Sequence, residues 1–592
     1  MDQAVGPVNA TEHRGDDDLL SAGLGLAGLR GPPATFADPA APTPAELRRR
    51  AIQTAWKAIA DLGPLGGYGT IYGAVPNVPG REFHAFARLL RARTSHRVLT
   101  QVPDHFDTSK RCLIVTASSG SRGIYGAIAV AGAWGLANGC AVAHTDKGTG
   151  AGYFDCRDES GVALDGTRAH VGDAELEFVP DVYTSTCGIA IKHAHSKDNP
   201  EADWGEHLLQ AAQFGLAMLD RALPQHAPFT HANTRIVAVG LSNGGTAALQ
   251  AAGLDDKAWL AGVVAIEPNI YAPAGPGARA LYEYACEAAQ WMPAALLDAR
   301  FDTRLFAQLP GSTTPAWRER VESLRADGRI AGAPLATQSA QALAYLHERG
   351  WNEAVLATAV SSTAFDLWRF LAVTYASAYA RTGVDEMVAG FRFATLDAAG
   401  EPRLPTQAER AAWWSDAGGI APGNGVSIVD PYDRDRSVRP VPDRSLSGVA
   451  ALASLWSDET PLASRLRVSV AATAPRLPRA DLPIFIVHGA EDGLIPPMFS
   501  SAPYVAWLSS NGCDPTYWLI PHAQHFDAFL ALPGFGDRYV PMLAYAYAAI
   551  GRMVAQVTSG DGAQRASPPV PKPTARGARA LERTNLDLSG IA

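Results

Sequence analysis

Short apolar runs rich in β-branched residues alternate with helix-forming runs in two separate parts of the chain. Runs typical of strands cover residues 97–102, 112–117, 141–144, 235–239 and 262–266 in the first part, and 484–487 and 517–520 in the second. Helical patterns at 124–136 and 205–223 lie between strands of the first part. Strands that alternate with helices form mostly parallel sheets with helices on both faces. We therefore predict the α/β class, with a doubly wound, mostly parallel sheet.

The segment from about residue 270 to about residue 470 has helical periodicity and almost no strand pattern. Its expected helices cover residues 278–291, 316–326, 339–349 and 354–380. The last of these is strongly aromatic, and we interpret most of its rings as core packing at helical spacing. Because the segment separates two consecutive strands of the sheet, we predict a large, mainly helical lid insertion.

These changes of pattern divide the chain into five parts. We expect an irregular N-terminal arm at 1–42, the two parts of the sheet domain at 43–269 and 471–555, the insertion at 270–470, and a linker-like tail at 556–592. A helix is expected to open the sheet domain, because Thr43 can cap it, Pro44 suits its first turn and Glu46 can complete a capping box.

Composition and charge argue against several classes of function. The chain has 592 residues and a formal net charge of −9, and no run rich in Lys or Arg stands out, so a nucleic-acid partner is not expected. No apolar stretch is long enough to span a bilayer. The polar, acidic start lacks the features of a signal peptide. We expect a cytoplasmic protein, or a secreted or periplasmic one whose presequence this sequence does not include; the oligomeric state stays open.

The six cysteines are too sparse for a disulfide scaffold in a chain of this length. Cys112 and Cys140 each directly precede an expected strand. If the two strands are parallel neighbours that start level, the thiols could come within bonding distance. Two free, buried thiols are the interpretation that we favour.

The rest of the chain is organised around Gly240-Leu-Ser242-Asn-Gly244, which follows the strand at 235–239 without a spacer. A helix-forming run comes next, so the context is strand, tight turn and helix, as a nucleophile elbow requires. The glycines permit a sharp turn and leave the Ser242 hydroxyl free at the carboxyl edge of the sheet. An ordinary Gly-rich turn is the alternative interpretation.

An elbow serine needs an acid and a base, which follow it along the chain in α/β-hydrolases. Asp492, in the turn after the strand at 484–487, is our candidate for the acid, with Glu491 as the alternative. His488 precedes the acid, which does not fit this order, so we interpret it as structural.

Two histidines, His522 and His525, lie in the loop expected to carry the base. Only one of them can face the serine while its other ring nitrogen meets the carboxylate. We favour His525, at the far end of the loop. His193 and His195 alternate in a polar stretch without zinc-ligand spacing, and we interpret them as a solvated pair.

An oxyanion hole should use the backbone N–H of Asn243, the residue after the nucleophile. A second N–H should come from the loop at 118–123, and Gly120 is our choice. These residues predict a serine esterase that acts through an acyl-enzyme and requires no metal or organic cofactor.

Several long motifs of the chain resemble one known family. They are Thr116-Ala-Ser-Ser-Gly-Ser-Arg-Gly-Ile-Tyr-Gly-Ala-Ile128, Ala143-His-Thr-Asp-Lys-Gly-Thr-Gly150, Gly240-Leu-Ser-Asn-Gly-Gly245 and Ala523-Gln-His-Phe-Asp-Ala-Phe529. Together with Asp18-Leu-Leu-Ser-Ala-Gly-Leu-Gly25, they are similar to motifs of the D-(−)-3-hydroxybutyrate oligomer hydrolases, over about residues 16 to 550.

The resemblance implies an α/β-hydrolase that cleaves ester bonds in short 3-hydroxybutyrate oligomers left by polyhydroxybutyrate breakdown. The family serine carries over to Ser242, and the shared Ala-Gln-His-Phe motif supports His525 as the base. Family members often carry an export signal, and this chain shows none. A related carboxylesterase for feruloyl esters or synthetic polyester fragments is the alternative.

Such oligomers end in a free carboxylate, which a site for short substrates would gain by binding. Arg122 lies in the loop expected beside the oxyanion hole, and its guanidinium can hold a carboxylate through two hydrogen bonds. We therefore predict that Arg122 binds substrate, with Lys147 as the next candidate. The alternative is that Arg122 pairs with a carboxylate of the protein and braces the loop.

Overall fold

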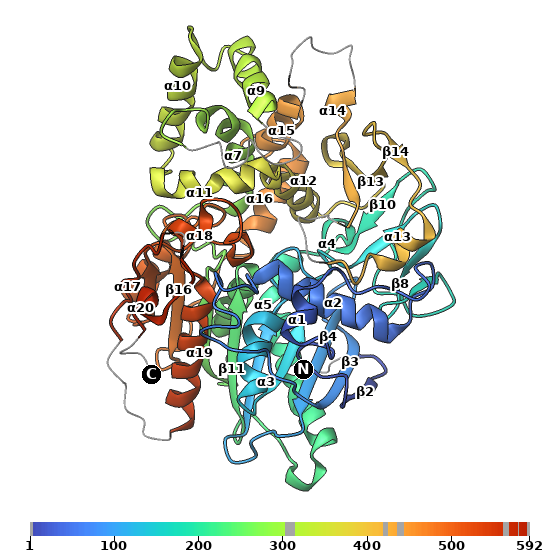
Figure 1. Cartoon of the computed structure of the whole chain (residues 1–592). Coiled ribbons are helices and arrows are strands. Elements are labelled where there is room, and N and C mark those ends of the chain that lie inside the picture. The colour runs from blue at the N-terminus through green and yellow to red at the C-terminus, as the bar shows by residue number, and fades with distance from the viewer. Residues whose placement is uncertain are drawn as a thin grey trace.

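The computed structural model describes residues 4–301, 314–417, 424–434, 443, 445–559, 568–577 and 579–588. Within these residues the main element is a ten-stranded sheet in the order β1-β3-β4-β6-β5-β11-β12-β16-β17, with β2 also paired to β3 (Figure 1). Its strands are β1 (Ala4–Val5), β2 (Asn9–His13), β3 (Gly80–Arg88), β4 (His96–Pro103), β5 (Cys112–Ala117), β6 (Ala141–Thr145), β11 (Arg235–Leu241), β12 (Leu260–Ile266), β16 (Ile484–Gly489) and β17 (Thr516–Ile520).

The six strands from β6 to β17 in this order are parallel, as predicted, and the pairs that join β3, β4 and β6 are antiparallel. Successive residues of β11 face opposite sides of the sheet. Ile236 packs in the core that includes α5 (Pro200–Ala222) and α6 (Asn243–Leu254). Val237 packs in the core that includes α2 (Pro44–Ile59) and α19 (Met542–Thr558). The doubly wound arrangement of an α/β-hydrolase is therefore present.

The two strands that follow Cys112 and Cys140 are parallel neighbours that start level, because Leu113 pairs with Ala141. Both cysteines are buried and unbonded, which confirms the favoured prediction of free thiols. The predicted cap of α2 is also present: Thr43 Oγ1 accepts from the Glu46 N–H, and the Glu46 carboxylate accepts from the Thr43 N–H.

The N-terminal arm is more regular than we expected. Strand β2 pairs antiparallel with β3, an element that the sequence analysis missed, and α1 (Gly25–Arg30) follows it. Between them the buried Asp18 carboxylate accepts hydrogen bonds from the backbone N–H groups of Leu20, Ser21 and Gly23. This side chain provides the hydrogen bonds that a turn of irregular backbone would otherwise lack.

The segment between β6 and α5 forms a second sheet in the order β10-β7-β8-β9, followed by α4 (Lys192–His195). Its strands are β7 (Tyr153–Asp155), β8 (Ser160–Val162), β9 (Arg168–His170) and β10 (Ile189–Ile191). His193 and His195 on α4 are both buried, so the prediction of a solvated pair is wrong. His193 Nε2 lies 2.6 Å from Glu201 Oε1, and His195 Nδ1 accepts a hydrogen bond from the Ile191 N–H.

The described residues between 270 and 470 form a mainly helical block stacked on one end of the main sheet (Figure 1). Its longer helices are α7 (Leu281–Ala295), α9 (Thr314–Ala326), α10 (Leu335–Glu348), α11 (Glu353–Ala364), α12 (Leu367–Ala380), α15 (Ser445–Ser454) and α16 (Pro461–Ala471). The single helix expected at 354–380 is broken, because Asp366 between α11 and α12 adopts a left-handed conformation with φ of 56°.

This block also contains a small antiparallel sheet in the order β14-β13-β15, which the sequence analysis did not predict. The strands are β13 (Arg392–Leu396), β14 (Pro402–Arg403) and β15 (Val426–Val429). They are short, and β15 pairs with β13 across about 30 residues of chain, so no local hairpin signal marks that pair.

The tail also differs from the linker that we expected. Residues 560–567 lie outside the described part, but beyond them Leu581 and Leu586 are buried against the main core. Buried Arg576 donates 2.6 Å hydrogen bonds to the carbonyls of Gly536 and Leu65. Among the helices described, none combines the length and the apolar character needed to cross a bilayer.

Candidate active site

The turn between β11 and α6 is strained in the way that a nucleophile elbow requires. Ser242 has φ of 58° and ψ of −123°, a backbone conformation that residues other than glycine rarely adopt. A Cβ atom on Gly240 would lie 2.1 Å from the Gly244 carbonyl oxygen, and one on Gly244 would lie 2.3 Å from the Ala117 carbonyl oxygen. Both glycines are therefore needed for the close approach of β11, α6 and the end of β5.

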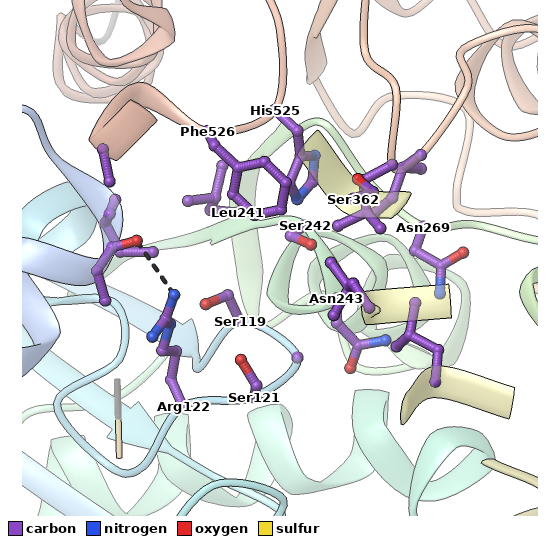
Figure 2. A pocket seen from close by; sticks show the side chains of 18 of the residues that line it. Ser119, Ser121, Arg122, Leu241, Ser242, Asn243, Asn269, Ser362, His525 and Phe526 are labelled. Atoms are coloured by element: carbon purple, nitrogen blue, oxygen red, sulfur yellow. Dashed lines mark hydrogen bonds between the residues drawn. The ribbon is translucent and has the colours of Figure 1, made fainter. Parts of the chain in front are cut away.

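His525 and Asp492 come together from loops that follow adjacent parallel strands. His525 Nδ1 lies 2.7 Å from Asp492 Oδ2, and the other carboxylate oxygen accepts from the N–H groups of Leu494 and Ile495 at 2.8 and 2.7 Å. Because Nδ1 donates to the carboxylate, Nε2 is the nitrogen left for the serine. Ser242 and His525 line one cavity, and in Figure 2 the His525 ring lies above the Ser242 side chain.

Asp492 is fully buried, yet it is held as the anion. Burial alone would raise its pKa, but the neighbouring imidazoles of His525 and His488 outweigh burial and hold the pKa below its usual range. His488 Nε2 lies 3.2 Å from Asp492 Oδ2 and 2.9 Å from the Ile495 carbonyl, so it donates its proton within the acid loop. This contact fits the structural role that the sequence suggested for His488.

The alternative acid and base lie outside this arrangement. Glu491 is next to Asp492 in the chain but lies 3.8 Å from His522 Nδ1, and the His522 side chain is 42% exposed. Neither of them lines the cavity that contains Ser242. The geometry therefore favours the first choice in both cases.

The two predicted oxyanion donors lie beside Ser242. Asn243 is the first residue of α6, so its N–H has no carbonyl partner within the helix. Gly120 lines the same cavity, and a Cβ on Gly120 would lie 3.8 Å from Asn243 Cβ, an ordinary contact distance. The close position fits the prediction, but a glycine is not required there on steric grounds.

A buried polar network lies behind Asn243, and the sequence analysis did not find it. Lys147 Nζ donates to Glu201 and to the side-chain oxygen of Asn243, whose amide donates to Glu201 Oε2 at 3.0 Å. Trp204 Nε1 donates to the Asn243 carbonyl at 3.1 Å. Burial lowers the pKa of Lys147, and the Glu201 carboxylate opposes this effect. Lys147 is thus engaged within the protein and does not line the cavity, which removes it as a candidate for binding substrate.

Arg122 lines the cavity on the same side as Ser119 and Ser121 (Figure 2). It is 9% exposed, and its Nη2 donates to the Ala58 carbonyl at 3.1 Å. Its Nη1 is buried without a hydrogen-bond partner, and no carboxylate of a described residue pairs with it. Burial lowers the pKa of Arg122 to about 10. No carboxylate of the described residues therefore supports the alternative role, in which Arg122 pairs with a protein carboxylate.

The cavity has a volume of about 390 Å³ and a mostly apolar wall. Residues of the sheet domain and of the insertion both line the cavity. The sheet domain contributes Leu241, Leu494 and Phe526, among others. The insertion contributes Leu281, Ser362, Phe365, Leu367, Leu371 and Tyr375.

The insertion also contacts the acid loop directly. Thr358 Oγ1 on α11 donates to the Glu491 carbonyl at 2.5 Å. A Cβ on Gly493 would lie 2.3 Å from the Ala359 nitrogen.

One further acidic residue reaches His525. Glu267, directly after β12, is completely buried, and its Oε2 lies 3.5 Å from His525 Nδ1. No motif marked this residue, because an isolated Glu after a strand carries no distinctive spacing.

The chain is similar to known proteins over most of its length. The model of the family described as 3HB-oligomer hydrolase matches residues 2–586. A D-(−)-3-hydroxybutyrate oligomer hydrolase from Paracidovorax citrulli is 34% identical over 92% of this chain and 86% of its own. One from Burkholderia ambifaria is 35% identical over 94% and 87%.

Among solved structures, feruloyl esterase B from Aspergillus oryzae covers 99% of this chain and 91% of its own, with a TM-score of 0.37 and 11% identity. A likeness at that level carries no inference, whereas the family match spans nearly the whole sequence. The chain belongs to the 3HB-oligomer hydrolase family.

Proposed function

We propose that this protein is a serine esterase that hydrolyses short 3-hydroxybutyrate oligomers to the monomer, as a step of polyhydroxybutyrate degradation. The observation that carries the proposal is that His525, which lines the same cavity as the elbow serine, contacts buried Asp492 through Nδ1. Relatives that match over most of the chain are named for hydrolysis of these oligomers, and the carboxylic ester is the bond that a serine, a histidine and an oxyanion hole can cleave.

In the proposed mechanism Ser242 attacks the ester carbonyl while His525 Nε2 takes its proton. The N–H groups of Asn243 and Gly120 bind the oxyanion of the tetrahedral intermediate. His525 then protonates the leaving alkoxide, an acyl-enzyme remains on Ser242, and water activated by His525 releases the acid. Asp492 orients the imidazole and stabilises its charged form. These steps require no metal or organic cofactor.

The residues 270–470 act in this proposal as a lid that limits substrate size. Support comes from the six residues of the insertion that line the cavity and from its volume of about 390 Å³, which suits a small molecule. We expect soluble dimers and trimers to be hydrolysed much faster, per accessible ester, than crystalline polymer granules.

Release of monomer from the two substrates, normalised to hydrolysis of p-nitrophenyl butyrate, measures this difference. Equal normalised rates on trimers and granules would show that the insertion does not restrict access.

Arg122 is proposed to bind the terminal carboxylate of the oligomer. A buried guanidinium with an unpartnered Nη1 and no counterion among the described residues is costly, and a substrate carboxylate would supply the missing partner. Arg122→Lys is expected to lower kcat/KM for free-acid dimers and trimers by on the order of tenfold or more, because lysine cannot reproduce the bidentate contact.

The methyl esters of the same oligomers lack the charge and should be nearly unaffected by Arg122→Lys. The exposed Arg93, whose side chain pairs with Asp181, provides the control substitution Arg93→Lys. If Arg122→Lys lowers kcat/KM equally for the free acids and for their methyl esters, Arg122 supports the oxyanion loop instead. Lys57, which also lines the cavity, is then the next cation to test.

A further inference from the structure

We propose that Glu267 is a second orienting acid for His525, kept neutral beside the ionised Asp492 and able to replace it when that charge is removed. The inference rests on the proposed function, since it concerns the same histidine. Glu267 does not contact the reacting atoms in this account; it is a positioning residue that acts through His525.

The sheet brings Glu267 to this place. Ile266, the last residue of β12, pairs in parallel register with Val487 of β16, and the Glu267 N–H continues the ladder to the Val487 carbonyl at 2.7 Å. Glu267 itself adopts a φ of 46°, a left-handed conformation that costs energy in a residue with a side chain. The loop after β16 carries Asp492, so two neighbouring parallel strands each deliver one carboxyl group to His525.

The two carboxyl groups have different partners. Asp492 receives hydrogen bonds from two backbone N–H groups and from His525 and His488, and these partners stabilise a charge. Glu267 is buried as deeply, but neither of its oxygens has a hydrogen-bond partner among the described residues. One carboxyl oxygen of Glu267, one of Asp492 and one ring nitrogen of His525 all lie within 4.8 Å of one another. Two adjacent buried carboxyl groups cannot both ionise at low cost, so the poorly solvated one keeps its proton.

The groups around Glu267 agree with this assignment. Burial raises the pKa of Glu267 well above its usual range, and the nearby Asp492 and Asp527 raise it further. Asp527 is also buried, which raises its pKa to about 7, and its oxygens accept from the N–H groups of Met542 and Leu543. Asp492 is therefore the ionised carboxylate closest to both Glu267 and His525.

The pH profile of kcat/KM separates a second acid from a merely structural residue. A neighbouring carboxylate stabilises the imidazolium form of a histidine, whereas general-base catalysis requires the neutral imidazole. Loss of every such carboxylate is therefore expected to move the acid limb of the profile, where activity falls as the pH decreases, to lower pH. In Asp492→Asn, Glu267 is expected to ionise and accept from His525 Nδ1. The acid limb of this variant should therefore stay near that of the wild type, although kcat is much lower.

In Asp492→Asn/Glu267→Gln no carboxylate remains at hydrogen-bond distance from Nδ1. This double variant should move its acid limb to lower pH and lose roughly a further 10- to 100-fold in kcat, the effect of a charged hydrogen bond. Glu267→Gln alone should lower kcat by less than about tenfold and leave the limb in place, since it replaces a neutral group by another. Glu491→Gln, which alters the carboxyl group beside His522, is the matched control and should not move the limb.

Two results would overturn the role of Glu267. One is an acid limb that already moves to lower pH in Asp492→Asn. The other is a loss of kcat on Glu267→Gln that is equal in the wild type and in Asp492→Asn. Asp492→Ala, which introduces no amide to compete for Nδ1, repeats the comparison if the Asn variant folds poorly. Ser242→Ala in the same assay distinguishes the failures: if it remains active, the proposed function itself fails.

Discussion

Ser242→Ala and His525→Ala are each expected to reduce kcat for trimer hydrolysis by roughly 10⁵- to 10⁶-fold, while the protein remains folded. The serine forms the covalent bond, and the imidazole moves its proton, so either loss removes the acyl-enzyme route. Asp492→Asn should lose most activity but less than these two, since the carboxylate only orients and stabilises the imidazole. Release of monomer, measured by chromatography, gives the rates, and far-ultraviolet circular dichroism checks folding.

Members of a triad act as a unit, so the double variant Ser242→Ala/His525→Ala should be little worse than the worse single variant. His522→Ala is the matched control, because this histidine lies in the same loop but outside the cavity. If His522→Ala is inactive and His525→Ala is not, the assignment of the base is wrong.

The second large effect is expected at Glu201, in the network behind the oxyanion hole. Glu201→Gln would leave Lys147 buried without its counterion, and removal of one partner of a buried pair costs about 3–5 kcal/mol of unfolding free energy. The side chain of Asn243 would also lose its charged partner, and displacement of an oxyanion donor lowers kcat by about 100- to 1000-fold. Denaturant unfolding and trimer hydrolysis measure the two effects.

Glu206→Gln on the same helix provides the control. Its partner Arg91 is 54% exposed, so the change should cost at most about 1 kcal/mol. Removing both charges in Lys147→Met/Glu201→Gln should recover part of the lost stability, because no unpaired charge remains buried. A Glu201→Gln variant as stable as Glu206→Gln would refute a structural role for the pair.

The sequence could predict those features whose pattern lies within a short run of consecutive residues. Strands β5 and β11 are buried on both faces along nearly their whole length and therefore appear as almost continuous apolar runs. The elbow is likewise local, since Gly240 and Gly244 are needed by atoms within the same turn and the adjoining strand.

Strand β3 escaped prediction because polar residues interrupt its apolar pattern. Strand β3 carries Glu82, which is buried and bonded to Arg48 at 2.5 Å and to the Tyr125 hydroxyl at 2.9 Å. A charged residue at an inward position hides the strand, and its partners lie far along the chain. The contacts of Lys147 with Glu201, and of Glu267 with His525, likewise exist only after the sheet has formed.

Titration with a fluorophosphonate, followed by both the site of labelling and the remaining trimer hydrolysis, tests the central claim most directly. We predict one label per chain on Ser242 and a loss of trimer hydrolysis in proportion to labelling. Hydrolysis that persists in fully labelled protein, or a label on another residue that abolishes it, would contradict the account.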